Sequence, residues 1–178
     1  MDYNNIIDKY YSENSRLRDI LTTHSRLVAQ RAIACAKAKN LPVDLQFVEE
    51  AAMLHDIGIF RCDAPGIFCF GNLPYICHGV EGRNLLEKEG LPRHALVCER
   101  HTGAGLTVDD IIKQNLPLPH HDMTPVSLEE KLICYADKFY SKSGNITSEK
   151  SLERVLNSME RHGKETVERF LALHHIFS

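Results

Sequence analysis

The chain has 178 residues, a length that suits one domain with a proper core and hardly two. Hydrophobic residues make up 43% of it and charged residues 25%, as in ordinary globular proteins. The net charge of −3 argues against a nucleic-acid-binding module that works through a broad basic surface.

The N-terminal segment and the cysteines point to the cellular compartment. The start, MDYNNIIDKYYSENSRLRDI, lacks the basic and apolar regions of a signal peptide, and no apolar run approaches the ~20 residues of a membrane span. The six cysteines form no CxxC pair, which argues against a cysteine-based zinc site. We therefore expect a cytoplasmic protein with reduced thiols.

Helix patterns dominate the first half of the chain. Apolar residues spaced by three and four begin at Leu17 and predict a helix that ends at Asn40. Asp44 is the expected N-cap of a second helix, which runs into a loop that contains glycine and proline. Two short helices are expected within ICHGVEGRNLLEKEG and PRHALVCERHTG.

The second half continues in the same way after a proline-rich connection. Ser127 and Glu130 predict a capping box at the start of a helix. A final amphipathic segment is expected to break at Gly163. No strand alternation or internal repeat is present, so the sequence predicts a single all-α domain.

Polar residues on apolar helix faces are the candidates for a functional site. His24 and Asp137 each lie between apolar residues on one face of a helix, so both are expected to point inward. His55 and Asp56 end the apolar run in AAMLHDIGIF, where burial without partners would be costly. Neighbouring side chains such as these can converge on one site if the helix ends there, and Gly58 supplies an end.

Two further histidines belong to helix ends: His78 opens a predicted helix and His101 closes one. Imidazole and carboxylate groups together suit iron, manganese, cobalt, nickel or zinc better than calcium or magnesium. Taken alone, an inward histidine is more often a hydrogen-bonded core residue, and Asp137 alone would sooner cap a helix or pair with a cation. Their joint occurrence favours a metal site.

The order of these motifs resembles a known family. His24, LHDIG at 54–58 and YADK at 135–138 are similar to the H…HD…D signature of the HD superfamily of metal-dependent phosphohydrolases. CHGVEG and ERHTGAG add the two histidines of its binuclear branch, as in bacterial HD hydrolases of diadenosine tetraphosphate. In two departures, Ile59 replaces the lysine that often follows HDIG, and the GYP motif of cyclic-di-GMP phosphodiesterases is absent.

The resemblance covers about residues 20–145 and implies a fold, a metal centre and an activity. It implies one HD domain over residues 1–178, an all-α helical bundle with the metal site in its centre and C-terminal helices over residues 148–178. One metal ion would be held by His24, His55, Asp56 and Asp137, and a second by His78 and His101, with Asp56 bridging the two ions. Iron or manganese is expected, and zinc, cobalt or nickel also fits.

The activity implied is hydrolysis of a phosphoester or phosphoanhydride in a nucleotide-like substrate by a metal-bound hydroxide. Asp56 and Lys138 are the expected catalytic residues, and Lys138, Arg100 and Arg61 are the expected phosphate-binding residues. The expected partner is a small phosphorylated molecule, a nucleotide by preference, rather than nucleic acid or a membrane; a homo-oligomer is compatible with the sequence.

Two other functions stay open for the same ligand set. One is a mixed-valence di-iron oxygenase of the HD type, which would use dioxygen on a small organic substrate. The other is a non-catalytic HD domain that binds a nucleotide, although the complete set of ligand positions counts against it.

Overall fold

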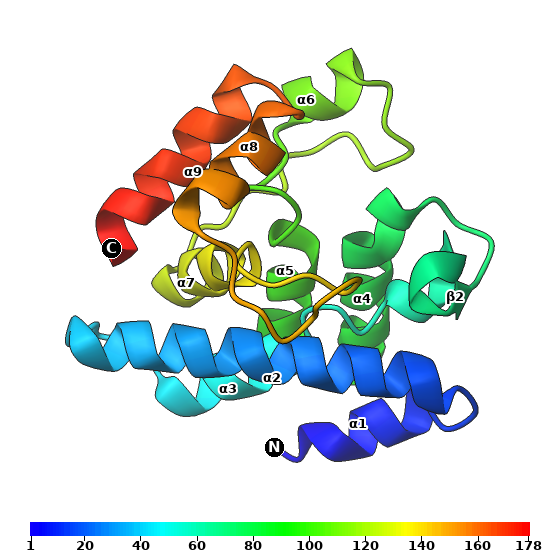
Figure 1. Ribbon diagram of the computed structural model, residues 1–178. Helices are drawn as coiled ribbons and strands as arrows, with labels where there is room; N and C mark the ends of the chain where they lie inside the picture. Colours follow the sequence, from blue (N-terminus) through cyan, green and yellow to red (C-terminus); the bar gives the residue numbers. More distant parts are fainter.

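The computed structural model describes residues 1–178 and consists mainly of helices (Figure 1). The α-helices are α1 (Tyr3–Tyr10), α2 (Ser15–Ala38), α3 (Leu45–Leu54), α4 (His78–Lys88), α5 (Pro92–Arg100), α6 (Val108–Lys113), α7 (Leu128–Asp137), α8 (Leu152–Glu160) and α9 (Lys164–Phe177). Short 3-10 helices lie at Ile59–Arg61, Pro65–Ile67 and Tyr75–Cys77. The predicted all-α fold is confirmed.

Helix capping follows the sequence signals in most places. Asp44 caps α3, as predicted, because its carboxylate accepts hydrogen bonds from two backbone N–H groups of the first turn. Ser127 caps α7 in the same way, but the predicted capping box is incomplete. The Glu130 carboxylate accepts a hydrogen bond from the N–H of Val126 instead of Ser127. Gly163 separates α8 from α9, where the break was predicted.

Helices α1 and α6 and the two strands were not predicted. Helix α1 has only eight residues and is capped by Asp2, and α6 has six residues and is capped by Thr107. Strands β1 (Asp63–Ala64) and β2 (Cys69–Phe70) pair antiparallel in the loop after α3. Strands of two residues are too short to show an alternating pattern, so periodicity could not have found them.

Two large apolar clusters make up most of the core, beside a small third one around Ile111, and the junction of the two large clusters defines the centre of the molecule. One cluster joins the C-terminal half of α2 to α3, α7, α8 and α9; the other joins α1 and the N-terminal half of α2 to α4 and α5. On α2, Leu21 belongs to the second cluster and Val28 to the first. The buried side chain of His24 lies between them, so polar groups are concentrated where the two clusters meet.

The helices surround this junction (Figure 1). Helix α2 runs along the bottom of the view with α1 and α3 beneath it, α4 and α5 lie side by side above it, and α8 and α9 lie at the upper left. The connection between α7 and α8 extends across the front of the molecule towards α4 and then returns. None of the helices combines the length and the apolar character that crossing a bilayer demands.

Candidate metal centre

The structure brings all six predicted ligands together at the junction of the two apolar clusters, although they are spread over much of the chain. They come from five places: His24 from α2, His55 and Asp56 from the end of α3, His78 from the start of α4, His101 from the end of α5 and Asp137 from the end of α7. All six are buried, with exposed fractions of at most 7%. Buried carboxylates and imidazoles at this density need compensating charge.

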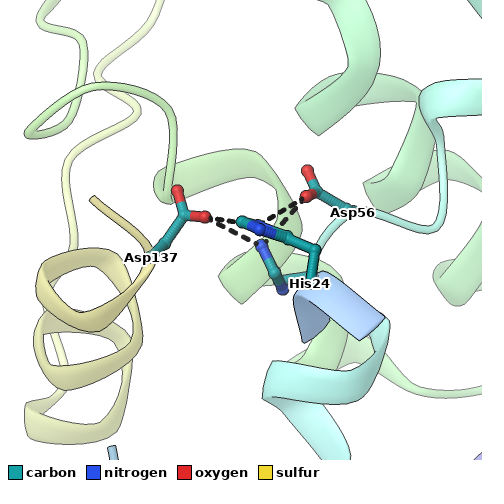
Figure 2. A group of neighbouring side chains, drawn as sticks. His24, Asp56 and Asp137 are labelled. Atoms are coloured by element: carbon teal, nitrogen blue, oxygen red, sulfur yellow. Dashed lines mark hydrogen bonds and ion pairs between the residues drawn. The ribbon is translucent and has the colours of Figure 1, made fainter. Parts of the chain in front are cut away.

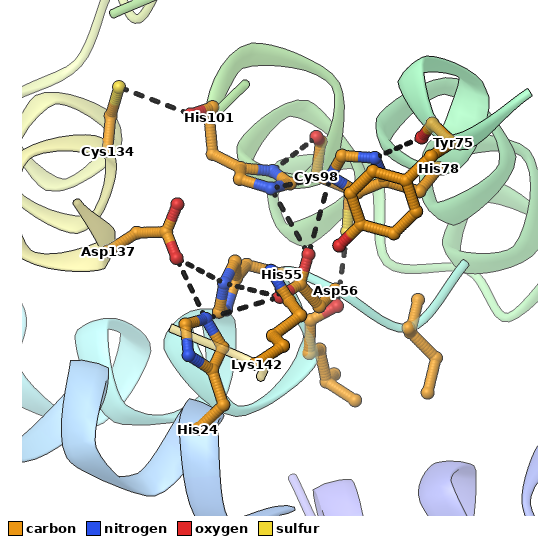
Figure 3. A network of polar contacts seen from close by, with 12 residues as sticks. His24, His55, Asp56, Tyr75, His78, Cys98, His101, Cys134, Asp137 and Lys142 are labelled. Atoms are coloured by element: carbon orange, nitrogen blue, oxygen red, sulfur yellow. Dashed lines mark hydrogen bonds and ion pairs between the residues drawn. The ribbon is translucent and has the colours of Figure 1, made fainter. Parts of the chain in front are cut away.

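The first group consists of His24, His55, Asp56 and Asp137, whose potential ligand atoms lie within 4.8 Å of one another. Figure 2 labels three of them, and Figure 3 labels all four. His24 Nε2 lies 2.8 Å from Asp137 Oδ1 and 3.3 Å from Asp56 Oδ2. His55 Nε2 lies 3.1 Å from Asp56 Oδ2 and 3.3 Å from Asp137 Oδ1. Two imidazoles and two carboxylates thus converge on one point, a set of donors typical of a transition-metal site.

The second group shares Asp56 with the first and adds His78 and His101 (Figure 3). The Nε2 atoms of the two histidines lie 3.1 Å apart. Asp56 Oδ1 lies 3.4 Å from Nε2 of His78 and 3.3 Å from Nε2 of His101. Because one carboxylate belongs to both groups, it lies where a bridge between two cations would lie.

Backbone carbonyls fix the orientation of three of the four rings. The Nδ1 atoms of His55, His78 and His101 lie 2.6, 2.6 and 2.7 Å from the carbonyl oxygen three residues earlier in the chain. Only an Nδ1–H can donate this hydrogen bond, so in the neutral ring the lone pair is on Nε2 and faces the cluster. This is the arrangement that a metal-binding histidine needs.

The two groups differ in their protonation. Burial by itself would lower the pKa of His55, but the carboxylates of Asp56 and Asp137 outweigh burial and raise that pKa to about 9. Burial and the neighbouring His101 lower the pKa of His78 to about 3, and burial also lowers the pKa of His101. Without a bound cation, His55 therefore carries a proton at neutral pH, whereas His78 and His101 are neutral.

Two features of the cluster favour the binding of a metal ion. Two neutral imidazoles that both direct an Nε2 lone pair at each other across 3.1 Å repel, and a cation between them removes that repulsion. Neither carboxylate oxygen of the buried Asp56 accepts a hydrogen bond, and of the two only Oδ2 has a lysine nearby, the ammonium of Lys142 at 2.7 Å. Since buried polar groups are otherwise nearly always paired, the cluster can bind a divalent metal ion.

Gly58 brings the second group close to the first, but not by ending the helix as predicted. Helix α3 ends earlier, at Leu54, and Gly58 has an ordinary backbone conformation with φ of −84°. A Cβ atom at this position would lie 2.3 Å from the carbonyl oxygen of His78 and 2.5 Å from the backbone nitrogen of Gly82. Glycine is therefore needed for the close approach of α4, which carries His78.

Lys142 is a residue of the site that the sequence did not reveal. Its ammonium lies 2.7 Å from Asp56 Oδ2, and its side chain is only 15% exposed. Burial would lower the pKa of Lys142, but Asp56 outweighs burial and raises it well above its ordinary value. Lys142 and Tyr75 also line a hollow of about 420 Å³ beside the cluster. The one available signal was a second lysine four positions after Lys138.

The three predicted phosphate-binding residues occupy different places. Lys138 lies at the cluster, where its ammonium donates hydrogen bonds to Asp137 Oδ2 at 2.6 Å and to the carbonyl of His101 at 2.8 Å. Arg100 is paired with Glu130 at 2.9 Å, and Arg61 packs over the ring of Phe60. The structure places Lys138 in contact with the cluster and does not bring Arg100 or Arg61 into it.

The family follows from comparison with known proteins. Residues 21–142 match the family model of the HD domain, and the chain belongs to this family. The predicted HD superfamily is thus confirmed. No solved structure is significantly similar to the chain.

Three relatives show what kinds of protein are similar to this one. A tRNA (cytidine(56)-2'-O)-methyltransferase of Thermoplasma volcanium is 31% identical over 162 residues, which are 90% of this chain and 42% of the relative. A protein of the same name from Picrophilus torridus is 31% identical over 82% of this chain and 38% of its own length. An uncharacterized protein of Methanocaldococcus jannaschii is 38% identical over 57% of this chain and 53% of its own length.

These relatives overturn several predictions. Two are named as tRNA methyltransferases, so the predicted metal-dependent phosphohydrolase is wrong, and similarity to diadenosine-tetraphosphate hydrolases is not supported. The predicted small phosphorylated substrate and the exclusion of nucleic acid are wrong for the same reason, because the names specify tRNA. Neither the oxygenase nor the nucleotide-binding alternative gains support. The chain spans less than half the length of the two methyltransferases.

Proposed function

We propose that this chain is a metal-binding HD domain that acts with tRNA in 2'-O-methylation. Its similarity to two proteins named tRNA (cytidine(56)-2'-O)-methyltransferase supports the choice of tRNA as the partner. The buried histidine and aspartate cluster supports a metal-dependent role. In this proposal residues 1–178 form one HD domain, which supplies the metal centre and contacts the RNA.

The proposed metal ions are held as the two groups suggest. The first ion would be held by His24, His55, Asp56 and Asp137, and the second by His78 and His101 together with Asp56. The pair of facing Nε2 atoms at 3.1 Å is the observation that carries this assignment. Iron and manganese fit the mixed nitrogen and oxygen donors, as do zinc, cobalt and nickel. Such ions would supply positive charge and Lewis acidity at this site.

The proposed nucleotide site is a hollow beside the metal ligands. The hollow of about 420 Å³ is lined by Tyr75, Lys142 and two serines, Ser141 and Ser143, among other residues. Its volume is within the range of small-molecule sites, so one nucleotide of an RNA strand fits it. Lys142, whose ammonium pairs with Asp56 and which lines the hollow, would hold a phosphate of that nucleotide.

Methyl transfer itself is assigned in this proposal to other parts of the methylation system. The two methyltransferases extend well beyond the part that this chain matches, which is 42% of one and 38% of the other. The HD domain is then the part that binds and positions the tRNA for the reaction.

Deletion of the gene in its host tests the proposal. Nucleosides from purified tRNA, measured by mass spectrometry, should lose 2'-O-methylcytidine in the deletion strain. A plasmid with the wild-type gene should restore it, and one with Asp56→Asn should not, because that change removes the carboxylate shared by both groups. Unchanged 2'-O-methylcytidine in the deletion strain would show that the proposed function is wrong.

A further inference from the structure

A basic hollow lies on α8, separate from the hollow beside the metal cluster. It has a volume of about 330 Å³ and is lined by Lys150, Arg154, Asn157, Ser158 and Arg161. Three of these residues are cations, none is acidic and none is hydrophobic. The hollow is therefore positively charged, although the chain has a net charge of −3.

The hollow follows from the amphipathic pattern of α8. Arg154, Asn157, Ser158 and Arg161 are spaced by three and four residues and therefore share one face of the helix. Val155 and Met159, on another face, are buried in the apolar cluster that also contains α7 and α9. The polar face is thus held at the surface by the packing of the opposite face.

The cations of this hollow have no partner within the protein. The half-buried Arg169 and Arg100 are paired with Asp110 at 2.6 Å and with Glu130 at 2.9 Å, whereas Arg154 and Arg161 are exposed. No carboxylate forms an ion pair with Lys150, Arg154 or Arg161. The hollow therefore lacks the anion that its charge would attract.

The hollow is connected to the metal centre by a short piece of chain. The N–H of Lys150 donates a hydrogen bond of 2.8 Å to the carbonyl of Phe139, two residues after Asp137. Burial lowers the pKa of Lys150, and the positive charges of Lys138 and Lys142 lower it further. The charge of Asp137 acts in the opposite direction. Positive charge thus continues from the cluster to α8 along the connection that crosses the front of Figure 1.

We propose that the α8 hollow binds the phosphate backbone of the tRNA, which extends the proposed function and rests on it. Arg154 and Arg161 are seven residues apart, roughly 10 Å along the helix axis, so they can reach different phosphates of one strand. Asn157 and Ser158 lie between them and can donate hydrogen bonds to phosphate or 2'-hydroxyl oxygens. The absence of hydrophobic lining disfavours a membrane surface, where apolar side chains contribute to binding.

Binding of an unmodified tRNA transcript, measured by fluorescence anisotropy at several salt concentrations, tests this surface. Arg154→Gln/Arg161→Gln should weaken binding roughly tenfold and reduce the slope of log affinity against log salt by about 1.5, since each lost phosphate contact removes about 0.7–0.9. Arg26→Gln/Lys37→Gln on the exposed side of α2 is the matched control, because it removes the same charge and should bind as the wild type does. Mn²⁺ affinity should stay unchanged in both variants.

The possible outcomes distinguish failure of the proposed α8 binding site from failure of the proposed function. If the wild type and the α8 variant bind tRNA equally well, the α8 hollow does not bind the tRNA backbone, and the proposed function stands. If the wild type fails to bind tRNA, both are overturned. Asn157→Asp places a negative charge in the hollow without shortening an arginine, and it should also weaken binding. Binding of anionic lipid vesicles that depends on the two arginines, without binding of tRNA, would assign the surface to lipid and overturn the proposal.

Discussion

The two groups of the cluster share Asp56 but balance their charge in opposite ways. In the first group two carboxylates face two imidazoles, and they raise the pKa of His55 to about 9 even though burial opposes this. In the second group two imidazoles share one oxygen of one carboxylate, and the pKa of His78 falls to about 3. The same residue types in the same core therefore favour a proton in one group and a lone pair in the other.

This difference shows how geometry, and not residue type, decides what a buried histidine does. The ring of His55 is near Asp56 and Asp137, so a metal ion must displace a proton there. The rings of His78 and His101 face each other, so a metal ion relieves repulsion. We expect the second group to bind its ion with less dependence on pH near neutrality than the first.

The largest expected effect comes from the residue that the groups share. Asp56→Asn keeps the side-chain volume but removes the charge that both groups share. Each ligand of a structural metal ion contributes on the order of 3 kcal/mol to its binding free energy, so the metal affinity of each group should fall by more than about a hundredfold. Isothermal titration with Mn²⁺ measures this. His120→Ala, at an exposed position, should bind like the wild type. Equal affinities of Asp56→Asn and the wild type would remove Asp56 from the centre.

Single ligand changes should separate the groups. His24 belongs only to the first group and His101 only to the second. His24→Ala and His101→Ala should therefore each lower the affinity for one ion by roughly a hundredfold and leave the other ion bound. Elemental analysis after dialysis should give one ion per chain in each variant. Loss of all metal in both variants would mean that the groups do not bind independently.

The stability of the metal-free protein should depend on pH through His55. The folded pKa of about 9 is above the ordinary 6.5, so the protonated ring contributes stability that is complete below pH 6.5 and is lost as the pH rises through 9. The loss should reach up to about 3 kcal/mol. Urea unfolding in chelator between pH 6 and pH 9.5 measures it. A His55→Ala variant with the same pH dependence as the wild type would contradict the assignment.

The smallest effect should come from Lys142. Its ammonium lies 2.7 Å from Asp56 Oδ2, where it competes with a metal ion for that oxygen. Lys142→Met should therefore raise Mn²⁺ affinity by about tenfold, the value of one modest charged contact. Lys88→Met changes an exposed cation on α4 and should have no effect. Weaker Mn²⁺ binding in Lys142→Met would show that the lysine supports the centre instead of competing with it.

The ligands could be read from the sequence to different degrees. His24 lies within α2, and Asp137 is the last residue of α7 and follows its apolar spacing, so periodicity gave the inward direction of both. His78 and His101 lie at helix ends, where periodicity gives no direction, and only the resemblance to the HD family identified them. Lys142 follows α7 in an irregular connection, so no pattern predicts that its side chain returns to Asp56.

Nearness in sequence misled the choice of phosphate-binding residues. Arg100 precedes His101, but on a helix neighbouring side chains diverge, and its guanidinium reaches Glu130 instead. The function was missed for a related reason. The ligand set specifies the metal chemistry that a site can support, but it does not specify the partner. The whole-chain charge of −3 conceals the positive charge of the α8 hollow, where we propose that tRNA binds.

Titration of the metal-free protein with Mn²⁺, followed by electron paramagnetic resonance, shows whether two metal ions share Asp56. We expect two ions per chain and a spin-coupled signal, because ions bridged by one carboxylate lie roughly 3.5–4 Å apart. Asp56→Asn should abolish the coupling. A single uncoupled ion at saturation, or no bound Mn²⁺ at all, would show that Asp56 does not bridge two ions.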